Sequence, residues 1–213
     1  MIVQSPSAAL RIVAVVTLLS LPGVVAAQGS RACSVSAIEG APARVEVAGR
    51  WSALEVGPLR DGSRLIVTGP GARCEIRCSD GLILTLGGGI EVVLEGLIGR
   101  AGPSESVVLR LLRGIIGIDA PNRTWQSFQV HTPLAIASAR TTSWLVEYAE
   151  LTGAGFFVRS GSIDVAAVRG EANVRLSAGN GITILPGVLS AEVVRWSATR
   201  IGGAGATLGF GWR

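Results

Sequence analysis

Lysine is absent from this sequence of 213 residues, in which all 19 basic residues are arginine. The absence excludes Schiff-base catalysis, serine–lysine dyads and the phosphate-binding P-loop, because each of these needs a lysine amine. Histidine occurs once, at position 131, which excludes metal sites built from several histidines. Charged residues make up only 16% of the chain, below the roughly 25% of ordinary domains, so the composition is not that of a disordered protein.

Glycine is abundant, with 29 residues that follow no period of three, so the chain is not collagen-like. Turn-forming residues separate short apolar or alternating runs at intervals typical of an all-β protein. A sandwich, a barrel and a solenoid all fit this pattern. We expect strands at 43–47, 64–67, 72–78, 82–86, 90–94, 107–112, 115–119, 126–130, 134–137, 144–148, 155–159, 163–168, 173–176 and 181–185.

The first segment is typical of an export signal. Arg11 precedes an apolar run at 12–21, Pro22 follows it, and small residues lead to a cleavage site after Ala27. An uncleaved anchor is the alternative, but the run is shorter than the roughly 18 apolar residues of a spanning helix, a length that no later stretch reaches. We therefore predict a signal peptide at 1–27, followed by an N-terminal arm at 28–42 and a β domain at 43–189.

The last segment, 190–213, is predicted to be a short helix with a glycine-rich tail. Ser190 is a candidate cap for a helix over 191–200, with Val193, Trp196 and Ile201 near one face. The tail that follows is either flexible or an extended segment that docks Phe210 and Trp212 on the domain.

Three cysteines remain after cleavage, and export permits them to form disulfides. Cys74 and Cys78 lie on one predicted strand, about 13 Å apart at roughly 3.3 Å per residue, which exceeds the roughly 7 Å limit for a disulfide. Cys33 can pair with either of them, leaving the other as a buried apolar side chain. Three unpaired cysteines are the other interpretation.

No catalytic constellation stands out. His131 ends a predicted strand, where a lone histidine is more often structural than catalytic. Glu91 and Glu95 share one strand face but lie about 13 Å apart, which is too far for the roughly 5 to 9.5 Å of a glycosidase pair. The arginines are spread singly, which is not the pattern of a nucleic-acid-binding surface. We therefore predict no enzymatic activity, no cofactor, no metal and no nucleic-acid partner.

Two stretches carry a family resemblance. Residues 59–81 contain a turn with aspartate and glycine, a threonine–glycine turn, an alternating strand and a second aspartate–glycine turn. Residues 128–147 contain a strand that ends in threonine and proline, followed by arginine, threonine and an aromatic residue. With a hairpin at 158–165 and a turn at 176–181, the region from 43 to 186 resembles the FecR-type periplasmic domain. The family motif corresponds to Thr132, Pro133, Arg140, Thr142 and Trp144, while Ala139, Thr141, Ser143 and Trp144 depart from its usual residues.

The resemblance implies an elongated, twisted, solenoid-like stack of short strands and a periplasmic location. Family members are best known as the periplasmic part of transmembrane regulators that couple an outer-membrane iron transporter to a cytoplasmic sigma factor. Only 11 residues precede the apolar run here, so we expect a stand-alone exported module without the cytoplasmic anti-sigma domain and without a membrane span after cleavage.

Three functions compete at this point. The leading hypothesis is a non-catalytic envelope module that binds a protein or an envelope polymer, with a role in sensing. The alternatives are a purely structural envelope protein and an enzyme that acts through His131. Within the family motif, we expect Arg140 to be structural first, since arginine and threonine in β turns usually bond to nearby backbone groups.

Overall fold

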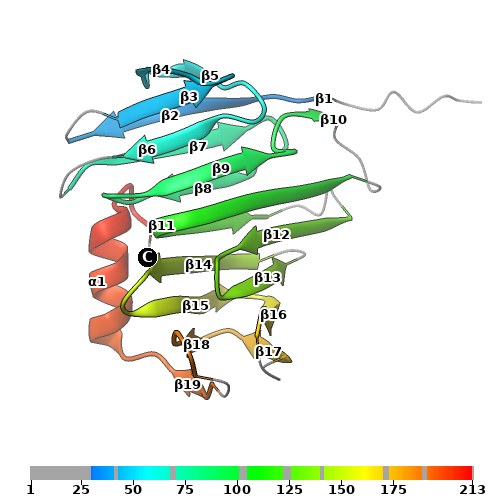
Figure 1. The fold of residues 1–213 in the computed structure, drawn as a ribbon, viewed down its shortest axis with the longest axis vertical. Coiled ribbons are helices and arrows are strands. Elements are labelled where there is room, and N and C mark those ends of the chain that lie inside the picture. Colours follow the sequence, from blue (N-terminus) through cyan, green and yellow to red (C-terminus); the bar gives the residue numbers. More distant parts are fainter. Residues whose placement is uncertain are drawn as a thin grey trace, which may run out of the picture.

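The computed structural model describes residues 30–40, 43–67, 71–100, 105–121, 126–139, 142–169, 173–188 and 191–212. Figure 1 shows strands stacked along the long axis of the molecule, with one helix beside them. The elements are β1 (Ser30–Arg31), β2 (Cys33–Glu39), β3 (Ala43–Val47), β4 (Arg50–Ala53), β5 (Gly57–Pro58), β6 (Arg64–Val67), β7 (Arg73–Cys78), β8 (Ile83–Leu86), β9 (Glu91–Glu95), β10 (Gly99–Arg100), β11 (Ser106–Ala120), β12 (Ser127–His131), β13 (Ala135–Ala139), β14 (Thr142–Ala149), β15 (Gly153–Ser160), β16 (Ser162–Ala167), β17 (Asn173–Ser177), β18 (Asn180–Ile184), β19 (Val193–Arg195) and α1 (Ala198–Leu208).

Two sheets form the stack. Sheet I has the order β5-β2-β7-β8-β11-β14-β15-β18-β19, and sheet II has the order β4-β3-β6-β9-β11-β12-β13-β16-β17. The pairing of β11 with β12 is parallel, and the other pairings within the two sheets are antiparallel. The chain passes from one sheet to the other after every one or two strands, so each pass adds a layer. The predicted all-β, solenoid-like fold with a short C-terminal helix is confirmed.

The longest strand, β11, belongs to both sheets. Its first part pairs with β9 and β12 in sheet II, and its second part, from Gly114, pairs with β8 and β14 in sheet I. Gly114 has a φ of +93°, which favours glycine, and the register shifts between Leu111 and Arg113. We predicted two strands here, at 107–112 and 115–119. The prediction of a break is wrong, because the glycine redirects the strand without ending it.

The main core lies between the sheets. Strands β9 and β12 bury every second side chain, as expected for strands with one covered face. Trp144 and Phe128 contact each other edge to face with ring centroids 6.4 Å apart, and both are fully buried. Burial of such side chains contributes about 1.5 to 3 kcal/mol each, which makes this core the main source of stability.

A second core lies on the outer face of sheet I. Helix α1 covers this face, and Leu208 and Trp212 pack there with Trp196 against Leu145 and Phe157. Both faces of β14 and β15 are therefore covered, which explains their nearly continuous burial. Within the described ranges, no helix has the length and apolar composition needed to span a membrane.

The helix lies later in the chain than we predicted. Ser197, and not Ser190, caps it, and the Ser197 hydroxyl accepts a hydrogen bond from the Arg200 backbone N–H at 3.2 Å. The residues at 193–195 form β19 instead of a helical turn. The glycine-rich segment is helical because its apolar residues, at helical spacing, pack on sheet I and offset the low helix propensity of glycine. The segment docks through Trp212, but most of it is helical and not extended as we considered, and Phe210 is not part of the packed cluster.

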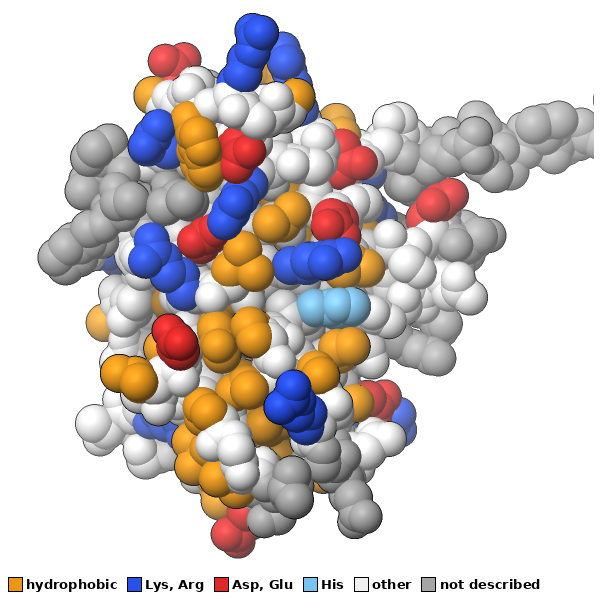
Figure 2. All heavy atoms as spheres, viewed as in Figure 1, with side chains coloured by type: hydrophobic (Ala, Val, Ile, Leu, Met, Phe, Trp, Pro, Cys, Tyr) orange, Lys and Arg blue, Asp and Glu red, His pale blue; other side chains and the backbone are white. Residues whose placement is uncertain are grey.

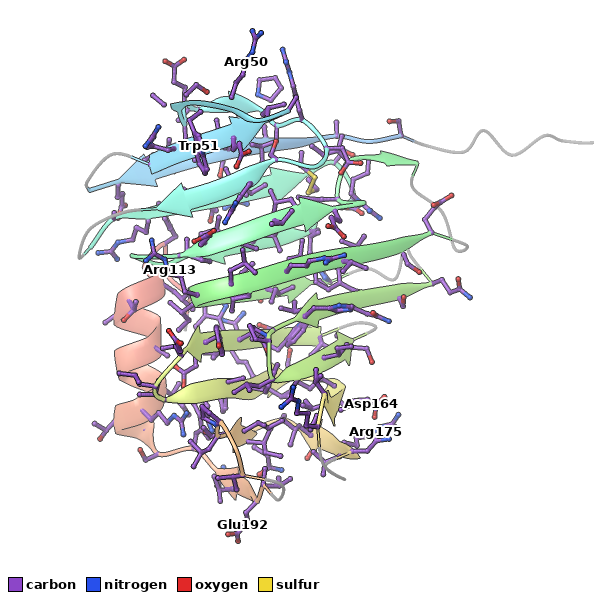
Figure 3. The ribbon with its side chains drawn as sticks, in the orientation of Figure 1. Arg50, Trp51, Arg113, Asp164, Arg175 and Glu192 are labelled. Carbon is purple, nitrogen blue, oxygen red and sulfur yellow. A yellow bond between two sulfur atoms is a disulfide. The ribbon has the colours of Figure 1, made fainter. Side chains whose placement is uncertain are left out.

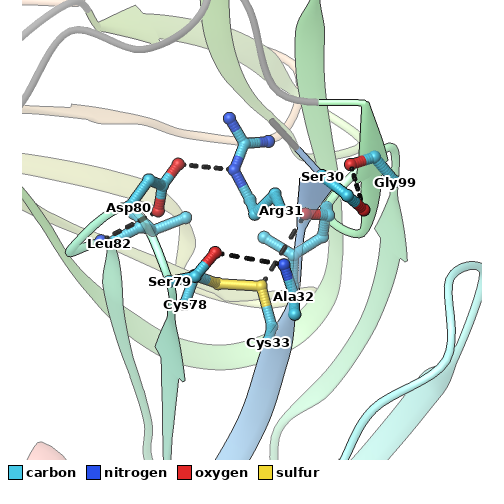
Figure 4. A network of polar contacts seen from close by, with 10 residues as sticks. Ser30, Arg31, Ala32, Cys33, Cys78, Ser79, Asp80, Leu82 and Gly99 are labelled. Carbon is cyan, nitrogen blue, oxygen red and sulfur yellow. Dashed lines mark hydrogen bonds and ion pairs between the residues drawn. A yellow bond between two sulfur atoms is a disulfide. The ribbon is translucent and has the colours of Figure 1, made fainter. Parts of the chain in front are cut away.

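The N-terminal segment also differs from the predicted arm. Cys33–Glu39 is strand β2, which lies between β5 and β7 in sheet I. A disulfide joins Cys33 to Cys78, the residue opposite it in the register, while Cys74 is buried and free. Figure 4 shows the contacts beside this bond, where the buried Arg31 side chain donates to Asp80 at 2.5 Å. These contacts attach the start of the described chain to the sheet.

Candidate functional site

The outer faces of the two sheets differ. Helix α1 and the segments beside it cover β11, β14 and β15 of sheet I, whereas no described element covers the outer face of sheet II. Figure 2 looks onto this uncovered face and shows charged and hydrophobic side chains mixed across it. Because the face belongs to the rigid stack and remains exposed, it is the candidate functional site.

A band of paired charges crosses the middle of this face; we call it the charged ladder. Its residues are Glu46, Arg64, Glu91, Glu95, Arg110 and Arg113, which project outward from β3, β6, β9 and β11. Arg64 forms an ion pair with Glu91, which also lies 3.8 Å from the Arg113 guanidinium, and Arg110 lies 3.1 Å from Glu95. Exposed pairs of this kind stabilise a protein by about 0 to 1 kcal/mol each. The ladder is therefore of more consequence for contacts at the surface than for folding.

An aromatic residue stands beyond the ladder on β4. The Trp51 side chain is 37% exposed, and the Arg44 guanidinium lies 5.2 Å from its ring centroid. Stacked arginine and tryptophan side chains of this kind are frequent anchors in protein interfaces.

His131 lies next to the ladder. Its Nε2 is 2.8 Å from Gln129 Oε1, and it stands opposite Arg110 in the pairing of β11 with β12. Partial burial and then the Arg110 charge lower the pKa of His131, while Glu95 opposes the shift. The imidazole is therefore neutral at pH 7. Among the described residues, no serine or cysteine forms a hydrogen bond with it, so the arrangement does not activate a nucleophile.

A polar hollow of about 540 Å³ opens on the other side of the ladder. Its residues come from the outer sides of β12, β13, β16 and β17 and the adjoining turns: Gln126, Ser127, Gln129, Ser138, Ala139, Thr142, Gly161, Ser162, Asp164 and Arg175. Gln129, Ser138, Asp164 and Arg175 stand in one row across the four strands. Arg175 binds Asp164 through two hydrogen bonds, at 2.8 and 2.9 Å, and Figure 3 shows this pair at the edge of the sheet. Because this pair neutralises itself, the hollow offers mostly neutral hydroxyl and amide groups.

The family-motif residues divide between the turns and the core. Thr132 Oγ1 donates to the Ala135 carbonyl at 3.0 Å and accepts from the Leu134 and Ala135 N–H groups, which closes the turn at Pro133. Thr142 Oγ1 donates to the Ser162 carbonyl at 3.0 Å and lines the hollow. Trp144 lies in the main core. Arg140 lies outside the described residues.

A second polar cluster was not expected from the sequence. Arg159 Nη2 donates to Asp119 Oδ1 at 2.5 Å, Ser143 also donates to Asp119, and the Arg159 guanidinium lies 5.0 Å from the Trp212 ring. These residues are far apart in the sequence, and only the register of β11, β14 and β15 brings them together. The cluster holds the end of the chain on sheet I. Within the described part of the chain, no three histidine, cysteine or acidic residues are grouped as metal ligands.

Comparison with known proteins identifies the family. The model described as "FecR protein" matches residues 64–173, which are 110 of the 213 residues. The chain belongs to the FecR family. The match includes the ladder residues of β6, β9 and β11 and most of the polar hollow, and it ends within β17.

Solved structures show the same fold. Two crystal structures of a "putative anti-sigma factor" from Parabacteroides distasonis, at 2.50 and 1.65 Å resolution, are similar, with TM-scores of 0.52 and 0.50. Each is 18% identical in sequence, and each match covers 64% of this chain and 62% of the other. This chain therefore spans less than two thirds of those structures. No curated protein matches the sequence.

Proposed function

We propose that this FecR-family chain is a non-catalytic signalling module of the bacterial envelope that binds a protein partner through the outer face of sheet II. The family match and the similar structures support a role related to signalling. The observation that carries the choice of surface is the uncovered charged ladder, which lies beside Trp51 and Arg44 on the same face.

The composition of this face suits a protein better than a small molecule. Arginine and tryptophan are enriched in protein interfaces, and rows of both charges steer a partner of complementary charge. Positive and negative side chains alternate at fixed positions along the ladder. A partner must therefore match this order of charges, which fixes how it is aligned on the face. The neutral His131 and its Gln129 contact provide no orienting acid and no bound nucleophile, which supports a role without turnover.

An envelope polymer is a second candidate ligand, because the polar hollow offers an ordered row of hydroxyl and amide groups with no net charge. Such a row suits a polyhydroxylated chain that lies across the strands. Binding of soluble glycan fragments, lost on Ser138→Trp but not on reversal of Arg110, would favour the polymer over a protein.

Site-specific crosslinking tests the protein-binding role. A photoreactive residue in place of Leu112, on the ladder face, should capture one envelope protein in living cells, whereas the same residue in place of Ala206, on α1, should not. Arg110→Glu should then weaken binding of the captured partner. Arg77→Glu is the matched control, because both side chains are 56% exposed and paired with one glutamate, but Arg77 belongs to sheet I. Equal loss with both variants would contradict the proposal.

A further inference from the structure

The two ends of the stack are open. Strands β4 and β5 form one end, and β17 and β19 form the other (Figure 1). Within the described ranges, each edge strand pairs with a neighbour on one side only, and this leaves its outer backbone groups without a strand partner there. Proteins built from stacked layers normally finish each end with a polar cap, and without one the ends tend to associate.

Exposed apolar side chains occur at both of these open ends. Of the nine large exposed hydrophobic residues among those described, four lie on or next to the edge strands. Trp51 and Val56 are at the β4/β5 end, and Val193 and Val194 are on β19. Exposed apolar groups that are clustered in this way mark an interaction surface, whereas scattered ones do not.

The two ends have different shapes. Between β4 and β5 lies a hollow of about 520 Å³, with the buried Leu54 and Leu59 as its floor and Val45, Val47, Val56 and Pro58 among its lining residues. At the opposite end, Val193 stands opposite the core residue Ile182 in the pairing of β18 with β19, so it faces the space between the sheets, and it is 39% exposed. Val194 faces the other side of sheet I, because successive side chains of a strand point to opposite faces. One end is therefore hollowed, and the other end carries an exposed valine on its inner face.

Unpaired charges mark the same two ends. Arg50 and Glu55 at the β4/β5 end, and Glu192 and Arg195 at the β17/β19 end, are exposed and form no ion pair with any described residue. Figure 3 shows Arg50 and Glu192 at opposite extremes of the molecule. In the charged ladder, by contrast, each charge has a partner. Each end thus carries unmatched charges of both signs.

We propose that this chain associates head to tail, with the β17/β19 end of one copy seated on the β4/β5 end of the next. In this contact Val193, on the inner face of β19, enters the hollow above Leu54 and Leu59, and the charges of Arg50 and Glu192 meet. Sheets I and II then continue from copy to copy. Pro58 has no backbone N–H, so the pairing of β19 with β5 is incomplete and the apolar contact provides most of the binding.

A contact between two different surfaces does not close on itself. When a projecting apolar patch fits a hollow elsewhere on the same molecule, each added copy presents a new free end, so the assembly grows in one direction. A symmetric contact between two β17/β19 ends would stop at the dimer and leave the hollow unfilled. The hollow at one end and the exposed Val193 at the other favour the head-to-tail arrangement.

Light scattering after gel filtration, and sedimentation over a range of concentrations, test the proposal on the exported protein. The mass of the wild type should rise with concentration beyond that of a dimer. Val56→Glu and Val193→Glu should each remain monomeric, because each blocks one end. An equimolar mixture of these two variants should form dimers and nothing larger, since each variant keeps the end that the other has lost. Leu112→Glu is the control on the middle of the face, and it should assemble as the wild type does.

Charge reversal provides a second test that does not place a charge in the apolar contact. Arg50→Glu and Glu192→Arg should each raise the concentration needed for assembly, and the double variant should restore it. A wild type that is monomeric at every concentration would overturn the proposal, as would a mixture of the two valine variants that stays monomeric. Dimers formed by Val56→Glu alone would instead assign the contact to two β17/β19 ends. Melting curves that match the wild type establish that each variant is folded.

Discussion

At the scale of the residue, two glycines on sheet I leave room for tryptophan side chains. A Cβ at Gly117 would lie 2.6 Å from Trp212 Nε1, and one at Gly181 would lie 2.1 Å from Trp196 Nε1. Neither glycine has a positive φ, so steric space and not backbone freedom requires it. The two indole rings therefore rest on the backbone of the sheet, and this close approach is what fixes the C-terminal segment.

Replacement of one of these glycines should show the effect directly. We expect Gly181→Ala to lower the free energy of unfolding by about 1 to 3 kcal/mol, because the new methyl group overpacks the site of Trp196. Gly202→Ala, in α1, should raise it by about 0.5 to 1 kcal/mol, because a Cβ added there would have nothing within 4 Å and alanine favours the helix. Urea denaturation followed by tryptophan fluorescence measures both. Equal effects of the same sign would contradict this account.

The free cysteine predicts how stability depends on alkaline pH. Burial raises the pKa of the Cys74 thiol to about 12, from its usual value of 9.0. Between these values the unfolded chain loses the thiol proton while the folded chain keeps it, so stability should be complete below pH 9 and fall above it. The slope should reach about 1.4 kcal/mol per pH unit. Denaturation curves from pH 8 to pH 11 test this, and Cys74→Ala should have a shallower slope. Because the chain has no lysine, few other groups titrate in this range.

At the scale of the element, β11 depends on one glycine at its crossing point. Gly114 has a positive φ, and a Cβ there would lie 2.6 Å from Ile90 Cα. We expect Gly114→Ala to lower the free energy of unfolding by about 2 to 4 kcal/mol, through backbone strain and steric overlap together. Gly89→Ala is the control, because Gly89 has a similar φ of +69° but nothing within 4 Å, so it should lose only the strain. Thermal melting of both variants would separate the two effects, and equal losses would show that overlap is unimportant.

The elements also show what the sequence could and could not predict. Alternation of apolar residues located most strands within one or two residues, since a strand in either sheet has one face on the core. Strand β4 was missed because all four of its residues are exposed, so it has no alternation. Helix α1 was placed too early because glycine lowers helix propensity, and packing of Trp196 and Leu208 on sheet I overrides that preference.

At the scale of the whole molecule, the register is what the sequence could not provide. The charged ladder pairs residues from β6, β9 and β11, and single arginines spaced along the chain do not indicate that they will meet. Likewise, the choice of Cys78 over Cys74 as the partner of Cys33 depends on where β2 enters sheet I. The resemblance to the family located the fold and the turn at Thr132. It did not locate the exposed face, because a face is exposed only where no other element packs on it, and motif residues do not indicate this.

Export and oxidation should be linked in the intact molecule. We predict that cleavage follows Ala27, so that the mature chain begins at Gln28, just before β1 and Cys33. Disulfides persist in the periplasm but not in the cytosol, so the exported form should carry the Cys33–Cys78 bond. After denaturation it should then show one reactive thiol, that of Cys74. The same chain without residues 1–27, kept in the cytosol, should show three reactive thiols.

Mass spectrometry with thiol labelling measures both the new N-terminus and the thiol count. An exported chain that retains Met1 would indicate an anchor in place of a signal peptide, and three thiols in the exported form would contradict the link between location and fold.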